Sequence, residues 1–234
     1  MGLQGVTIPV FDLTEKQVQE MLGIMQTYFL NVTRDQFLTD LEEKDQVILL
    51  SEDGRVRGFS TQMRLQHNIN GHQINVVFSG DTVIERSHWC SLALPLAFGG
   101  LMFSILAENP EAKLYWLLTS KGYKTYRFLP VFFRRFYPSI MNRTPTFEKE
   151  LLCSFGRQKF GDRFDAESDI VRAREGAQCL RPGVADITTA RRRDKHILFF
   201  EKANPDHARG DELVCIARFH ENNLNPFILR QLRR

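Results

Sequence analysis

The chain has 234 residues, 43% hydrophobic and 25% charged, which is the composition of a folded domain and excludes disorder throughout. Its formal net charge of +3 suits a phosphate-bearing ligand but is well below that of a typical nucleic-acid-binding domain. No CxxC pair and no apolar stretch of ~18 residues occurs. We therefore expect reduced thiols in the cytoplasm, no metal site, no membrane span and no export signal.

The start of the chain predicts one edge strand and two helices. Residues 6–13 are apolar, but Pro9 cannot donate a hydrogen bond to a central ladder, so a strand here fits a sheet edge. Thr14 then resembles a helix cap, because the apolar residues after it have the spacing of one buried helix face. A second, shorter helix begins at Thr33.

The next segment changes to the pattern of a three-strand antiparallel meander. Residues 46–50, 56–66 and 73–85 are the three expected strands. Asp53–Gly54 and Asn70–Gly71 separate them, and both pairs favour the positive φ angles that two-residue hairpin turns need.

A helix, a strand and an aromatic segment follow the meander. Residues 92–106 form an almost wholly apolar helix, and residues 114–119 form a strand that ends in polar residues. We expect an aromatic-rich helix over residues 121–128, with Pro130 and Pro138 limiting how far it continues.

Regularity weakens in the following region. Residues 147–155 fit either a strand or a helix, whereas residues 156–194 are polar and rich in Gly and charge. We expect an irregular insertion there, with one short helix at about residues 166–173. The run Arg191 to Arg193 predicts a solvated turn or a contact for an acidic partner. Two strands are then expected at residues 196–202 and 212–220, and a final short helix at the end.

This order of elements resembles the GNAT N-acyltransferase superfamily over roughly residues 7–152, resuming at His196. The resemblance implies an α+β fold whose mixed, mainly antiparallel central sheet is flanked by helices. We expect one domain over residues 1–234 that carries the insertion at about 156–194. The terminal strand and helix also offer a surface for a homodimer.

In that superfamily, the loop after the meander reads Gln or Arg, two residues, Gly, one residue, then Gly or Ala, and its amides hold the pyrophosphate of acyl-CoA. The corresponding stretch here runs from His88 to Ala93, and only Ala93 matches outright. Ser91 replaces the usual Gly, which leaves room for another thioester such as the phosphopantetheine arm of an acyl carrier protein. The resemblance implies these cofactor-binding residues: Trp89, Cys90, Ser91, Leu92, Ala93 and Ser120.

The resemblance also implies a tyrosine that protonates the departing thiolate. Tyr123 and Tyr126 are the candidates, since the pKa of a phenol is close to that of the thiol it would serve. The alternative is that both rings pack in the core.

A general base is needed because an ammonium has no free lone pair with which to attack a thioester. Glu85 and His88, at the end of the third meander strand, are the preferred pair, and Asp81 is a further candidate. The alternative is that Glu85 and Arg86 form a surface ion pair. Cys90 near a helix start is a less favoured nucleophile, because GNAT chemistry ordinarily proceeds by direct attack.

The sequence therefore predicts an N-acyltransferase that uses acyl-CoA or acyl-phosphopantetheine and an amine-bearing small molecule or peptide. The apolar helix at 92–106 points to a medium or long fatty acyl chain if it lines a channel, or to core packing if it is buried. Gly99–Gly100 in this helix allows close approach of a neighbour. The rival hypothesis is a catalytically silent GNAT-fold protein that binds a partner. A third is an RNA binder, whose affinity would depend strongly on salt.

Overall fold

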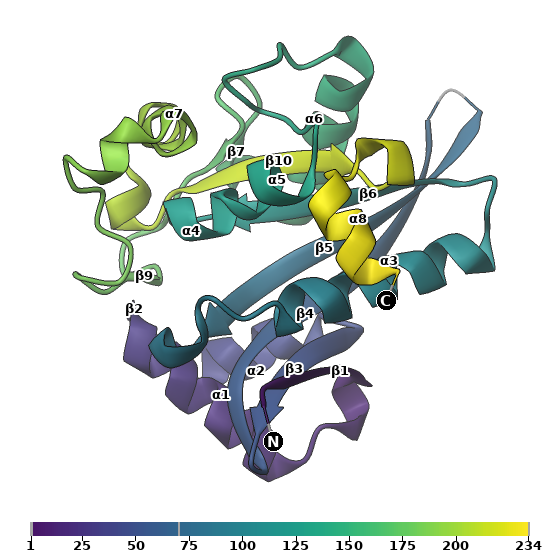
Figure 1. Cartoon of the computed structure of the whole chain (residues 1–234). Helices are drawn as coiled ribbons and strands as arrows, with labels where there is room; N and C mark the ends of the chain where they lie inside the picture. The colour runs from purple at the N-terminus through teal and green to yellow at the C-terminus, as the bar shows by residue number, and fades with distance from the viewer. Residues whose placement is uncertain (1, 70, 234) are drawn as a thin grey trace. The chain divides into compact units, whose positions relative to one another are not determined.

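The computed structural model describes residues 2–69 and 71–233 (Figure 1). The chain divides into two compact units. The N-terminal unit runs up to Leu114 and includes the residues from Leu229 onward, and the C-terminal unit is Tyr115–Ile228. The boundaries fall inside one strand and inside the last helix.

The helices and strands of the N-terminal unit follow the predicted order, except that Phe29 and Leu30, expected at the end of the first helix, form the short strand β2. Thr14 caps the first helix, where its side chain accepts from the Gln17 amide and Gln17 reciprocates. The elements are β1 (Gln4–Pro9), α1 (Glu15–Tyr28), β2 (Phe29–Leu30), α2 (Arg34–Glu42), β3 (Gln46–Glu52), β4 (Arg55–Ile69), β5 (His72–Ile84) and α3 (Ala93–Glu108).

The strands of this unit pair in the order β1, β3, β4, β5, and every pair is antiparallel. The predicted meander and the edge position of β1 are confirmed. Asp53 has φ +51° and Gly54 has φ +72°, as the turn prediction requires. In the second predicted turn, Gly71 has φ +77°, whereas Asn70 lies outside the described residues.

Both faces of β3 are buried, which explains its unbroken apolar run. Val47 and Leu49 face the helices α1 and α2. The pleat turns Ile48 and Leu50 to the opposite face, where they are also buried. On that side α3 packs so closely that a Cβ on Gly5 of β1 would lie 2.9 Å from the Ala97 Cβ and 3.2 Å from Leu50. Only glycine fits at position 5.

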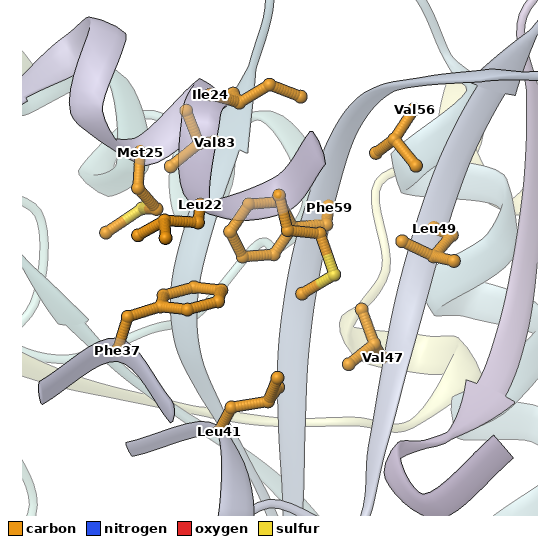
Figure 2. Packing of buried hydrophobic residues seen from close by; sticks show 11 residues of the cluster. Leu22, Ile24, Met25, Phe37, Leu41, Val47, Leu49, Val56, Phe59 and Val83 are labelled. Carbon is orange, nitrogen blue, oxygen red and sulfur yellow. The ribbon is translucent and has the colours of Figure 1, made fainter. Parts of the chain in front are cut away.

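The core between the two helices and the meander is continuous (Figure 2). Phe37 of α2 and Phe59 of β4 meet edge to face at its centre, with ring centroids 6.2 Å apart. The buried members of this cluster are Met21, Leu22, Ile24, Met25, Phe37, Leu41, Val47, Leu49, Val56, Phe59 and Val83.

The C-terminal unit pairs its strands in the order β6, β10, β8, β7, again antiparallel. The fold class, α+β with mainly antiparallel strands, is therefore as predicted. The elements are β6 (Lys113–Ser120), α4 (Tyr123–Tyr126), α5 (Phe128–Phe132), α6 (Thr146–Phe160), β7 (Phe164–Asp165), β8 (Ile170–Val171), β9 (Cys179–Leu180), α7 (Lys195–Ala203), β10 (Glu212–Arg218) and α8 (Pro226–Leu232).

Residues 196–202, predicted as a strand, are instead part of the helix α7. Asp194 caps this helix by accepting from the His196 amide, and the buried residues Ile197 and Phe200 are three apart, which is helical spacing. A short apolar run fits a strand or a buried helix equally well, and the strand predicted here is wrong.

The helix predicted at about residues 166–173 is also wrong. Ile170 and Val171 form β8 and pair with β10 and β7. The turn before it is held by Asp165, whose carboxylate accepts from Ser168 and from backbone amides, and these bonds lower the pKa of Asp165 to about 2. A turn stabilised by one carboxylate replaces the expected helix.

The aromatic-rich helix is shorter than predicted. It divides into the single turn α4 and the short α5, with Arg127 between them, and the chain is extended again at Phe133. Residues 147–155, which fitted either element, are helical and belong to α6. Within residues 2–69 and 71–233, no helix combines the length and apolar character needed to cross a bilayer.

His207 is a partly buried base that makes the stability of the C-terminal unit depend on pH. Its two ring nitrogens are shielded from solvent and have no hydrogen-bond partner within residues 2–69 and 71–233. Its ring stacks on the ring of Phe200, with centroids 5.4 Å apart. Burial lowers the pKa of His207, while Glu201 and Asp206 oppose that shift. Because the unfolded chain protonates this group at a higher pH, the free energy of unfolding falls as pH drops through about 6.5.

We expect His207→Leu to reduce this loss of stability, because leucine has no proton to bind. Urea denaturation at several values from about pH 7 to about pH 5 measures the slope. Phe227→Leu, at a residue of the same unit that is 52% exposed and has no titrating group, is the control and should keep the slope of the unmodified protein. Equal slopes in both variants would contradict the prediction.

Candidate active site at the end of the meander

The candidate site surrounds the loop that joins β5 to α3. Because the strands are antiparallel, the end of β5 lies beside the start of β4 and the end of β3. Ile84 pairs with Gly58, and Glu52 pairs with Arg55. The register thus brings the end of β3 to the loop that the sequence singled out.

His88, one of the two predicted bases, is held at both ring nitrogens. Its Nε2 lies 3.1 Å from Glu52 Oε2, and its Nδ1 lies 2.8 Å from Ser87 Oγ. The side chains of His88 and Glu52 are only 16% and 28% exposed, whereas Ser87 is exposed. Sequence reasoning missed both partners: only the strand register joins Glu52 to His88, whereas Ser87 is the preceding residue and was not considered.

Glu85, the other predicted base, is paired with Arg57. The Arg57 guanidinium lies 3.3 Å from the Glu85 carboxylate, and the Glu85 amide donates to the Arg57 carbonyl at 2.8 Å. The Arg86 guanidinium lies over the Trp89 ring, 5.1 Å from its centroid. Each predicted base thus has a partner of its own: a cation holds Glu85, whereas a carboxylate and a hydroxyl hold the ring of His88.

Several amides expected to bind phosphate are already bonded within the loop. The Trp89 amide donates to the Arg86 carbonyl at 3.4 Å, and the Ser91 amide donates to the His88 carbonyl at 2.9 Å. The Ala93 amide donates to Ser91 Oγ at 3.1 Å, so the serine that replaces glycine caps the helix itself. Within the described part of the chain, no partner is present for the amides of Cys90 and Leu92.

The apolar helix α3 has one covered and one open part. Its residues Leu94, Leu101, Met102 and Ile105 are buried. A Cβ on Gly99 would lie 2.1 Å from Leu232, so this glycine admits the side chain of the C-terminal segment. Leu92 and Leu96 are 37% and 38% exposed, and they stand one turn apart at the open end of the helix.

Tyr126 of the C-terminal unit is a core residue, which agrees with the alternative that its ring packs in the core. It is 0% exposed, its hydroxyl donates to the Pro138 carbonyl at 3.1 Å, and burial raises its pKa well above the usual value. A hydroxyl so enclosed is not placed to protonate a thiolate. Tyr123 is 5% exposed, with the Arg191 guanidinium 6.0 Å from its ring centroid.

Ser120 and Cys90 complete the set of predicted site residues. Ser120 is fully buried, and its hydroxyl donates to the Gly122 carbonyl at 2.8 Å, so this hydroxyl serves the turn after β6. Cys90 is exposed and carries a free thiol.

No protein-family model and no curated protein matches the chain. A Trypanosoma brucei acetyltransferase of known structure is 15% identical over 62% of this chain and 100% of its own, with a TM-score of 0.40. A GCN5-related N-acetyltransferase from Kribbella flavida is 15% identical over 54% of this chain, with a TM-score of 0.41. An Enterococcus faecalis V583 protein described as "Probable N-Acyltransferase" is 14% identical over 54%, with a TM-score of 0.40.

The chain spans 32% of the Kribbella protein and 31% of the Enterococcus protein. An acetyltransferase and a GCN5-related N-acetyltransferase are thus among the solved structures to which this chain is similar. At identities of 15% or less, the likeness concerns the fold alone.

Proposed function

We propose that this protein is an N-acyltransferase that moves an acyl group from a CoA or acyl-carrier-protein thioester to an amine. The observation that carries the proposal is the placement of His88. A carboxylate holds its imidazole at the end of an antiparallel meander, directly before an apolar helix. An imidazole is the commonest protein base for removing a proton near neutral pH.

In this reaction the amine attacks the thioester carbonyl directly. A carbon–nitrogen bond forms, the carbon–sulfur bond breaks, and His88 accepts the proton that the attacking ammonium must lose. The departing thiolate takes up a proton and leaves as the thiol. The acceptor is an amine-bearing small molecule or peptide.

The free amides in the loop suggest a donor with few phosphate contacts. Ser91 already occupies the Ala93 amide, so the loop offers the amides of Cys90 and Leu92. Such a set suits the single phosphate of a phosphopantetheine arm better than a pyrophosphate. The exposed Leu92 and Leu96 suit an apolar acyl chain, since each buried methylene contributes about 0.8 kcal/mol.

The test is a thermal shift with acyl-CoAs and acyl carrier proteins of increasing chain length. We expect the melting temperature to rise with chain length, because a ligand bound only by the folded state stabilises it, by about 2.7 kcal/mol at 100 times Kd. Leu96→Asp should remove this chain-length dependence. Phe11→Asp, at a residue that is 85% exposed, is the matched control and should retain it.

The rival function is a catalytically silent binding protein, and the locally bonded amides of Trp89, Ser91 and Ala93 favour it. The same experiment separates the two. Absence of stabilisation by any thioester would contradict the enzymatic proposal and support the rival.

A further inference from the structure

Ser87, His88 and Glu52 form a connected chain of hydrogen bonds that direct attack by an amine does not require. Ser87 Oγ lies 2.8 Å from His88 Nδ1, and Glu52 Oε2 lies 3.1 Å from His88 Nε2. A hydroxyl, an imidazole and a carboxylate in this order are the components of a nucleophilic triad, which is recognised by geometry and not by sequence position.

The chemistry of the partners sets the direction of these hydrogen bonds. An ionised carboxylate can only accept, so the neutral imidazole carries its proton on Nε2 and donates it to Glu52. His88 Nδ1 is then the acceptor, and the Ser87 hydroxyl must be the donor. Nδ1 can therefore take the serine proton while the carboxylate holds Nε2, so the two ring nitrogens are exchanged relative to the Ser-His-Asp triad.

A nucleophile must be accessible to its substrate, whereas the base and the carboxylate behind it can be shielded from solvent. Ser87 is exposed and open to a reactant, whereas the side chains of His88 and Glu52 are 16% and 28% exposed. The carboxylate comes from the end of β3, and the other two residues come from the 3-10 helix Arg86–His88 after β5. The register of β3, β4 and β5 therefore places the Glu52 carboxylate beside the His88 ring.

We propose that Ser87 is the nucleophile of an esterase activity toward activated acyl esters and thioesters. Ser87 Oγ forms a bond to the acyl carbon while its proton passes to His88 Nδ1. The bond to the leaving alkoxide or thiolate breaks, and His88 returns the proton to that group. Water then attacks the acyl-serine, giving a proton to His88, and the carboxylic acid leaves as Ser87 is reprotonated.

Nearby groups suit the acyl part of such a substrate. The amides of Cys90 and Leu92 have no partner in the described residues, and they follow Ser87 closely in the chain. Amides of this kind stabilise the oxyanion of acyl transfer. Hydrolysis needs no amine, so this activity does not depend on the N-acyl transfer proposed above.

The experiment combines p-nitrophenyl acetate hydrolysis with labelling by a fluorophosphonate on the full chain. Trypsin cleavage after Arg86 yields a peptide from Ser87 to Lys113, and fragmentation of this peptide separates Ser87 from Ser91 and Ser104. We expect the adduct on Ser87, and Ser87→Ala should lower hydrolysis by about 10²-fold or more.

Ser104→Ala removes another exposed serine of the same peptide and should leave both readouts unchanged. Equal melting temperatures of the two variants show that any loss of activity is not a loss of folding. Full hydrolysis by Ser87→Ala, or an acetyl group found on Cys90 in place of Ser87, would overturn the proposal.

Glu52 acts through His88 and is a positioning residue. In Glu52→Gln the new carboxamide can donate to Nε2, which favours the tautomer whose protonated Nδ1 cannot accept from Ser87. We expect kcat to fall by about 10²-fold with KM unchanged. A rise in KM alone would indicate a structural role and contradict the assignment.

Discussion

Replacing Phe59 by alanine is expected to lower the free energy of unfolding of the N-terminal unit by about 3–5 kcal/mol. Phe59 is 0% exposed and lies at the centre of the core, edge to face with Phe37 (Figure 2). Removing the ring leaves a cavity between α1, α2 and the meander, which the surrounding helices and strands cannot fill without breaking their own contacts. Urea denaturation followed by circular dichroism measures the loss.

Phe11→Ala is the control for this substitution, because the same ring is removed from a residue that is 85% exposed. It should change the free energy of unfolding by no more than about 0.5 kcal/mol. A loss of similar size in the two variants would show that Phe59 does not anchor the core.

His88→Gln is expected to reduce amine acylation by about 10²–10⁴-fold, because glutamine keeps a polar side chain but cannot take up the proton of the attacking amine. Thiol release from the thioester and mass spectrometry of the acylated amine measure the rate. The melting temperature should change little, since His88 contributes no apolar side chain to the core.

His220→Gln, at an exposed histidine of the C-terminal unit, provides the matched control and should retain full acylation. Unchanged acylation in His88→Gln would remove His88 from the proposed reaction. If acylation is lost but ester hydrolysis persists, His88 serves the amine alone and the triad is not formed in solution.

Local chemistry made the N-terminal unit predictable. The capping residue Thr14, the turn pair Asp53–Gly54 and the placement of Pro9 at the edge each act over a few residues. The edge strand, the two helices and the three strands of the meander appear in the expected order, whereas β2 (Phe29–Leu30) was expected to be the end of the first helix. The resemblance to the GNAT superfamily was inferred from their order alone.

The errors in the C-terminal unit come from segments whose structure depends on distant partners. Residues 196–202 are short and apolar, and a strand and a helix bury such a run equally well. Ile170 and Val171 are a strand because β10 provides a partner more than 40 residues away along the chain. No local pattern in residues 166–173 contains that information.

The candidate site was predicted in part for the same reason. His88 and the loop to Ala93 follow from the order of elements, whereas Glu52 is joined to them only by the register of β3, β4 and β5. An antiparallel meander places its first turn beside the end of its third strand, and this rule offered a route to Glu52. The self-capping role of Ser91 required the loop conformation itself.

The double burial of β3 sets how the N-terminal unit opens. With β1 and β4 on its edges, and α1 and α3 on its faces, the amide groups of Val47 to Leu50 reach solvent only when the whole unit comes apart. The far half of β4 alternates between exposed and partly buried residues and can fray independently. Deuterium uptake should therefore be slow in β3, where it reports global unfolding. It should be fast in the far half of β4, where it reports local opening.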